Sequence, residues 1–269
     1  MTVETASMRR GARTRPVKGL LRDTLVSFRR EMTPALREPG GVLLGTIIAM
    51  LQPLLFLVLF GPVLAGGGGR EQTWQWFIPG VLVMMCLFGP LSAGYSLLSE
   101  LIGGAMERML VTPASRTAML MGRTLKESLI LLVQAVLIVA VAIPMGLRPD
   151  LVGVIVGIAL LVVFGTGLGA LSFVLAILSR PSGTLFYLVT QTVVFPLMLL
   201  SGVLLPLEAA PGWLRAVAAL NPVTYVVEAQ RRLFVGELAA PPVLYGAVVA
   251  VAVAAVGLLL ATRAMRRAV

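Results

Sequence analysis

The sequence predicts an all-α integral membrane protein with six transmembrane helices. Only 13% of the 269 residues are charged, 58% are hydrophobic, and the mean hydropathy is +0.96. A soluble globular domain carries about 25% charged residues. In addition, the chain contains several long stretches without Asp, Glu, Lys or Arg, and a membrane-spanning helix needs about 20 consecutive apolar residues. Lipid offers no partner for unpaired backbone groups, and no barrel-type alternation appears, so we expect these stretches to be helices.

Six stretches define the expected spans. The uncharged stretches are residues 39–69, 72–99, 128–147, 151–179, 181–207 and 238–262. Within them we place transmembrane helices at about 42–63, 77–99, 127–146, 152–178, 184–204 and 240–261. In the fourth span, Gly153, Gly157, Gly165 and Gly169 share one four-residue row, which favours close helix packing within the subunit over a contact between subunits.

The distribution of Lys and Arg predicts that both termini lie in the cytoplasm. With the N-terminus inside, the inner segments hold 17 of the 22 basic residues. The outer segments hold five, which are Arg70, Arg148, Arg215, Arg231 and Arg232. This asymmetry follows the rule that basic residues stay on the cytoplasmic side.

Two segments precede the first predicted span. We expect residues 1–16 to be a disordered basic tail. Residues 17–38 are expected to form an amphipathic helix, because Leu21, Leu25, Phe28, Met32 and Leu36 recur at three- or four-residue steps beside arginines. Such a helix lies along the cytoplasmic interface of a membrane. The alternative is a helix that packs on a partner domain.

The sequence lacks the residues that most enzyme classes require. It contains no histidine and a single cysteine, Cys86, so it supplies no His-based or thiolate metal site and no Ser-His triad. The G-x-x-x-x-G-K-[ST] phosphate loop is absent, and the cores of the six expected spans carry no ionisable residue for proton relay. We therefore expect a non-enzymatic chain without a cofactor of its own, whose energy, if it moves a substrate, comes from elsewhere. The positive charge indicates cytoplasmic tails and loops rather than nucleic-acid binding.

The connector between the second and third spans has the composition of a short docking helix. Glu100, Gly104, Glu107 and Arg108 precede an apolar Met-Leu-Val run, and Pro113 then ends any helix. A cytoplasmic helix with a charged and an apolar face could dock into a groove of a soluble partner.

The segment 208–237 predicts two short helices that dip from the outer face, at 212–219 and 222–235. Asn221 before Pro222 is a typical helix start, with Asn as the cap and Pro in the first turn. Gly236 suits the C-terminal cap. A helix of that length covers about half a bilayer, as re-entrant elements do.

These two segments together resemble the permease subunit of ABC-type-2 exporters, the group that includes daunorubicin-resistance and polysaccharide or teichoic-acid export permeases. The resemblance covers residues 18–266, with the spans given above. Leu101, Ile102 and Gly103 stand where family members often carry further charges. The matching inner residues are Glu100, Gly104, Glu107, Arg108, Leu110, Thr112, Pro113 and Arg116. The matching outer residues are Phe195, Pro196, Ser201, Gly202, Pro206, Pro211, Trp213, Leu214, Asn221, Pro222 and Tyr225.

The resemblance implies a transport subunit that works in a larger assembly. Two ATP-binding cassette subunits, which bind ATP and Mg²⁺, would sit beneath two permease copies in a homodimer or heterodimer. The inner connector would be the coupling helix, and the outer short helices would lie near the exit. The implied activity is export of a drug-like, lipid or lipid-linked substrate through a bacterial plasma membrane. Two alternatives stay open: an ATP-independent secondary transporter or channel, and a non-transporting membrane scaffold.

Overall fold

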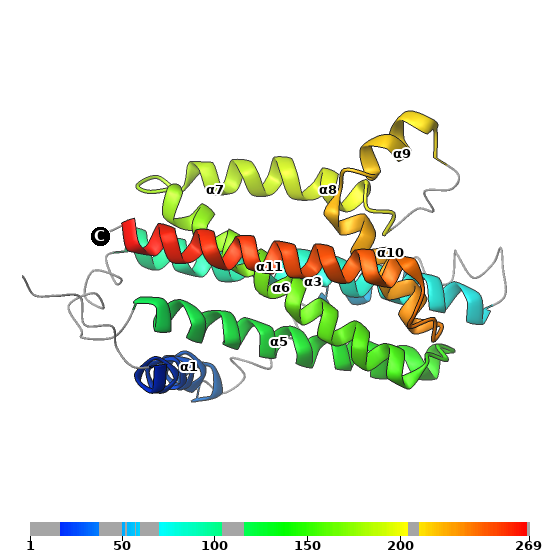
Figure 1. Cartoon of the computed structure of the whole chain (residues 1–269), viewed down its shortest axis with the longest axis horizontal. Helices are drawn as coiled ribbons and strands as arrows, with labels where there is room; N and C mark the ends of the chain where they lie inside the picture. Colours follow the sequence, from blue (N-terminus) through cyan, green and yellow to red (C-terminus); the bar gives the residue numbers. More distant parts are fainter. Residues whose placement is uncertain are drawn as a thin grey trace, which may run out of the picture.

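The computed structural model describes residues 17–37, 50–51, 53–56, 58–59, 70–103, 116–203 and 210–267. Within these residues every regular element is a helix and no strand occurs (Figure 1). The predicted all-helical class is therefore confirmed for the part of the chain that the structure describes.

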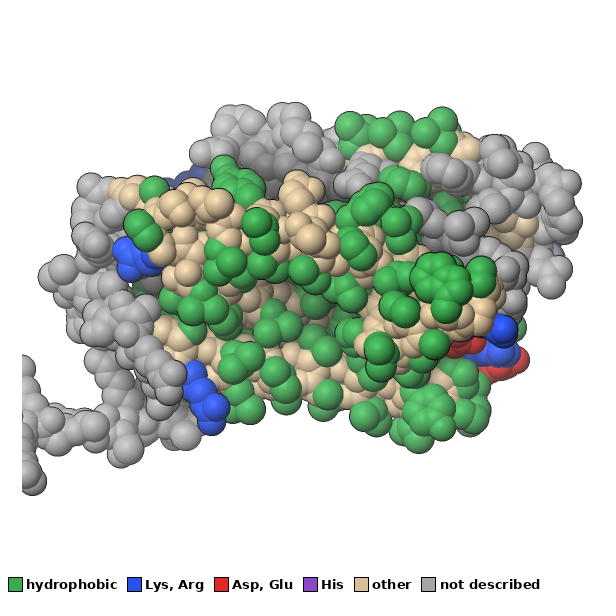
Figure 2. All heavy atoms as spheres, turned by 90° about the horizontal axis from the view of Figure 1, so that it is seen from above, with side chains coloured by type: hydrophobic (Ala, Val, Ile, Leu, Met, Phe, Trp, Pro, Cys, Tyr) green, Lys and Arg blue, Asp and Glu red, His purple; other side chains and the backbone are tan. Residues whose placement is uncertain are grey.

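Four long helices form the body of the molecule. They are α3 (Arg70–Ile102), α5 (Arg116–Met145), α6 (Leu151–Leu178) and α11 (Pro241–Arg267). Each contains a segment long and apolar enough to cross a membrane, namely Thr73–Ile102, Ala118–Met145, Leu151–Leu178 and Pro241–Met265. Figure 2 shows a broad band of hydrophobic side chains over one face, with the visible charged side chains at its two ends. These four helices match four of the six predicted spans.

The fifth predicted span, 184–204, is shorter in the structure. The chain is helical from Thr184 to Leu199 through α7 (Thr184–Val189), the π-helix η1 (Thr190–Val194) and α8 (Phe195–Leu199). At 1.5 Å per residue such a helix is about 24 Å long, less than the hydrocarbon core of about 30 Å. Pro196 has no N–H to donate into the preceding turns, where the π-helix lies. The first predicted span, 42–63, falls mostly outside the described residues, so six spans remain a prediction.

The central helix is α6, which packs against α3, α5, α10 and α11. Its glycine row faces neighbours of the same chain, as predicted. A Cβ at Gly153 would collide with the carbonyl oxygen of Leu233, and one at Gly165 would lie 2.8 Å from Leu131. A further close approach joins α6 and α11, where a Cβ at Gly167 would lie 2.6 Å from the backbone of Ala254. The small residues let the helix backbones come together.

The short helices lie at opposite ends of the bundle. The amphipathic helix α1 (Val17–Arg37) packs on α5 and is seen nearly end-on in Figure 1, so it lies across the long helices. The C-terminal end of α11 is at the same end of the bundle, which we call the α1 end. The other end, called the α10 end, carries α9 (Gly212–Ala218) and α10 (Pro222–Phe234).

Candidate functional sites at the two ends of the helix bundle

At the α1 end, a buried arginine joins three helices. Arg123, in the second turn of α5, is 8% exposed. Its Nε lies 3.2 Å from a carboxylate oxygen of Glu31 on α1, and its guanidinium also donates to Glu100 in the last turn of α3. We call Glu31, Glu100 and Arg123 the Arg123 cluster. A buried charge is tolerated when it is paired and hydrogen-bonded, so Arg123 holds α1, the last turn of α3 and the N-terminal part of α5 together.

The backbone of α1 lies directly on α5 beside this cluster. A Cβ at Gly122 would lie 2.7 Å from the side chain of Ser27 and 2.8 Å from the backbone nitrogen of Phe28. Glycine at 122 therefore permits the close approach that brings Glu31 to Arg123. Among the described residues, the amphipathic helix α1 thus packs on α5.

The structure describes one of the five predicted coupling residues. Glu100 pairs with Arg123, whereas Gly104, Glu107, Arg108 and Pro113 lie outside the described residues. The sequence analysis missed the Arg123 cluster, because it predicted that the third span begins at about 127 and so left Arg123 in the connector before it. The structure extends this helix back to Arg116. One sequence signal could have extended the predicted helix back over Arg123. Gly122 and Arg123 lie in a run of residues compatible with a helix.

At the α10 end, Asn221 holds the start of α10. Its Oδ1 accepts a hydrogen bond from the backbone N–H of Val223 at 3.0 Å, which confirms the predicted cap. Its Nδ2 also donates to the carbonyl of Leu197 on α8 at 2.7 Å. Thr224 adds hydrogen bonds from its hydroxyl to the carbonyls of Leu200 (3.3 Å) and Ala218 (3.0 Å). The start of α10 is thereby fixed to α8 and to α9.

The other predicted outer residues occupy different environments. Pro222 takes the first position of α10, and the hydroxyl of Tyr225 donates to the carbonyl of Ala219 at 2.8 Å. Trp213 on α9 is 69% exposed, so it does not belong to the core. Pro206 lies outside the described residues. The observed helices Gly212–Ala218 and Pro222–Phe234 agree with the predicted ones to within a residue.

Two polar residues of α10 that the sequence analysis missed fix it to the long helices. Gln230 is fully buried, and its Nε2 donates to the carbonyl of Gly157 on α6 at 2.7 Å. Arg231 donates to the carbonyls of Trp76 (3.2 Å) and Gly202 (2.7 Å), and its guanidinium lies 3.9 Å from the ring centroid of Trp76. These contacts join residues 29 to 155 positions apart, which no local pattern reveals.

The chain belongs to the ABC-2 type transporter family, whose model matches residues 22–235. Members of this family partner with ATP-binding cassette subunits. The chain is therefore a membrane subunit of an ABC transporter, as the resemblance of its two segments indicated.

Named relatives support this assignment. The chain is 31% identical to transport permease ycf38 of Cyanophora paradoxa over 70% of its own length and 67% of that protein. It is 29% identical to the daunorubicin resistance ABC transporter permease protein DrrB1 of Streptomyces coeruleorubidus, with the same coverage of both chains. It is 28% identical to a second ycf38 permease, from Pyropia yezoensis, over 74% of its length and 69% of that protein.

Proposed function

We propose that this chain is the permease of an ATP-driven exporter that moves a drug-like, lipid or lipid-linked substrate out of the cytoplasm through the plasma membrane. Two ATP-binding cassette subunits, with ATP and Mg²⁺, supply the energy, and a second permease copy completes the membrane part. Membership of the family and the resistance permease among the relatives support this proposal. The absence of a phosphate loop in the sequence agrees with ATP hydrolysis in a separate subunit.

The observation that carries the proposal is the Arg123 cluster. The excess of Lys and Arg assigns the α1 end to the cytoplasm. The connector 104–115 joins α3 to α5, and Arg123 ties the last turn of α3 to the start of α5 and to α1. A partner that pushes on this connector would therefore move α1, α3 and α5 together instead of bending one loop.

Within the connector, we assign Glu107 to the contact with a basic group of the ATPase. Adjacent helical residues point about 100° apart, so Glu107 and Arg108 cannot both face one partner residue. Arg108 would then meet lipid headgroups or a neighbouring loop, and Gly104 and Pro113 would bound the coupling helix. Glu100 contributes through Arg123.

The α10 end would lie at the outer face, near the exit. There Asn221, Pro222 and Tyr225 order α10, while Trp213 and Pro206 belong to the segment before it. The hydrogen bonds of Asn221 and Arg231 attach α10 to α8 and α3, so this short helix follows the movement of the long ones.

Co-purification and ATP hydrolysis test the proposal. The tagged full-length chain, purified from the membranes of its own host, should bring with it a subunit that carries a G-x-x-x-x-G-K-[ST] motif and hydrolyses ATP. Glu107→Ala should reduce co-purification or uncouple hydrolysis from export, because removing one partner of a charged interface contact costs about 2–5 kcal/mol. Arg108→Ala is the matched control and should do less. If Arg108→Ala loses the ATPase and Glu107→Ala keeps it, the assigned docking face is wrong; if the wild-type chain brings no ATPase, the export proposal fails.

A further inference from the structure

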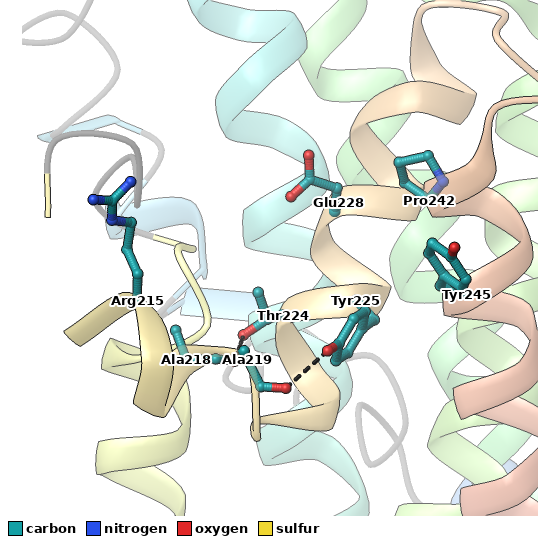
Figure 3. A pocket seen from close by; sticks show the side chains of 8 residues that line it. All are labelled: Arg215, Ala218, Ala219, Thr224, Tyr225, Glu228, Pro242 and Tyr245. Carbon is teal, nitrogen blue, oxygen red and sulfur yellow. Dashed lines mark hydrogen bonds between the residues drawn. The ribbon is translucent and has the colours of Figure 1, made fainter. Parts of the chain in front are cut away.

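A pocket of about 500 Å³ opens at the α10 end between three helices (Figure 3). Arg215 comes from α9, Glu228 from α10 and Tyr245 from α11. The other lining residues are Ala218, Ala219, Thr224, Tyr225 and Pro242. The pocket shares Thr224 and Tyr225 with the hydrogen bonds that order the start of α10, whereas Arg215, Glu228 and Tyr245 have no part in the sites described above.

The pocket carries one positive and one negative side chain, and these two do not form an ion pair with each other. Both Arg215 and Glu228 are exposed. In the part of the chain that the structure describes, neither side chain makes a hydrogen bond or an ion pair. Figure 3 shows the guanidinium of Arg215 and the carboxylate of Glu228 on the same side of the hydrogen bond between Tyr225 and Ala219. The arrangement suits a ligand that has both charges at separate atoms.

Two tyrosines complete the polar part of the pocket. The hydroxyl of Tyr225 donates a hydrogen bond to the carbonyl of Ala219, which holds the tyrosine ring in place. Tyr245 is 57% exposed and stands in the second turn of α11. Aromatic rings attract ammonium groups through their faces, and tyrosines are enriched at the depth where a membrane meets water.

The pocket lies at the edge of an apolar surface. The segment Pro241–Met265 is apolar enough to cross a membrane, and Tyr245 is near its start. Beside Tyr245 on α11, Leu244, Val248 and Val251 are 64%, 59% and 59% exposed. Their spacing of four and three residues places them on one face of the helix. A ligand with its head in the pocket therefore has an apolar surface beside it for a tail.

We propose that this pocket binds the headgroup of a zwitterionic phospholipid, with the phosphate at Arg215, the ammonium at Glu228 and the tyrosine rings, and an acyl chain along α11. An anionic lipid would place its phosphate at Arg215 and leave Glu228 without a partner. A cationic amphiphile would leave Arg215 without one. The proposal depends on the chain being embedded in a membrane and not on the direction or energy source of transport.

Binding of defined lipids to the purified full-length chain, measured by native mass spectrometry, tests the proposal. Phosphatidylethanolamine and phosphatidylglycerol with identical acyl chains are titrated separately. We expect phosphatidylethanolamine to bind about fivefold more tightly at one saturable site, which is the range of a single exposed charge contact. Glu228→Gln should abolish this preference by weakening phosphatidylethanolamine alone, and Glu228→Asp should retain it. Arg215→Gln should weaken both lipids.

The matched control is Arg232→Gln. Arg232 pairs with Glu237 at 3.0 Å at the same end of the molecule but does not line the pocket. This variant should bind both lipids as the wild type does. The proposal is overturned if the wild-type chain binds the two lipids equally, if Glu228→Gln keeps the preference, or if Arg232→Gln loses it to the same extent.

Discussion

Arg123 and Asn221 each join helices that lie far apart in the sequence. The side chain of Arg123 is 9% exposed, and those of its partners Glu31 and Glu100 are 22% and 29% exposed. Each of these charges has lost part of its hydration. The free energy of the folded state therefore depends on keeping all three charges paired. The two hydrogen bonds of Asn221 likewise serve two elements at once.

Replacing Arg123 should therefore destabilise the α1 end. Arg123→Ala leaves two carboxylates facing a vacated space, and we expect a loss of about 2–3 kcal/mol in the free energy of unfolding. Arg232→Gln, which breaks a pair whose side chains are 47% and 49% exposed, should cost at most about 1 kcal/mol. Denaturant unfolding of both variants in detergent micelles measures the difference. Equal losses would mean that the Arg123 cluster stabilises the fold no more than an exposed ion pair does.

Asn221 should matter more than a helix cap alone. Loss of the cap costs about 1 kcal/mol, but Asn221→Ala also removes the donor to the carbonyl of Leu197, so we expect about 2 kcal/mol in total. Asn221→Asp keeps an oxygen for the N–H of Val223 and lacks the donor. If the cap alone mattered, Asn221→Asp would unfold like the wild-type chain in the same assay.

At the scale of the elements, helix packing requires glycine only where two helix backbones approach closely. On α6, Gly153 faces the backbone of α10, whereas Gly169 faces the side chain of Pro90, to which an added Cβ would lie at 3.7 Å. The first contact is with backbone, which cannot move without shifting a helix. The second is an ordinary van der Waals contact.

The two glycines therefore give opposite predictions. Gly153→Ala should separate α6 from α10 and lower the thermal stability of the detergent-solubilised chain by several degrees. Gly169→Ala should leave it unchanged or raise it, because alanine is favoured over glycine in a helix by about 1 kcal/mol. A thermal unfolding scan of both variants is sufficient. If both variants changed the melting temperature alike, the close contact of Gly153 with α10 would not be what makes glycine necessary there.

At the scale of the whole molecule, α1 and the end of α11 share one end of the bundle, and α9 and α10 share the other. Of the four long helices, α3, α6 and α11 run from the α10 end to the α1 end, and α5 runs in the opposite direction (Figure 1). An even number of crossings places α1 and the end of α11 at the same end of the bundle. The excess of Lys and Arg predicts that the α1 end faces the cytoplasm.

Cysteine labelling tests this orientation. In a Cys86→Ser background, a cysteine at Ala210 or Gly67 should react with an impermeant thiol reagent added outside intact cells, and one at Ser115 should not. The background is suitable because Cys86 is buried and donates weakly to the carbonyl of Leu161, a bond that a serine hydroxyl can make. The reverse labelling pattern would refute the predicted orientation.

The sequence alone determined the all-helical class, the four long apolar helices, and both short helices near residues 212 and 222. These features depend on local information: uncharged runs of sufficient length, or an Asn-Pro start within one turn. Only the tertiary structure decided that Arg123 joins α1, α3 and α5, that Arg231 binds Trp76, and that the helix from Thr184 ends at Leu199 after a π turn. Those outcomes depend on which helix backbones approach each other. Contacts between residues up to 155 positions apart produce no periodic pattern in the sequence that could predict them.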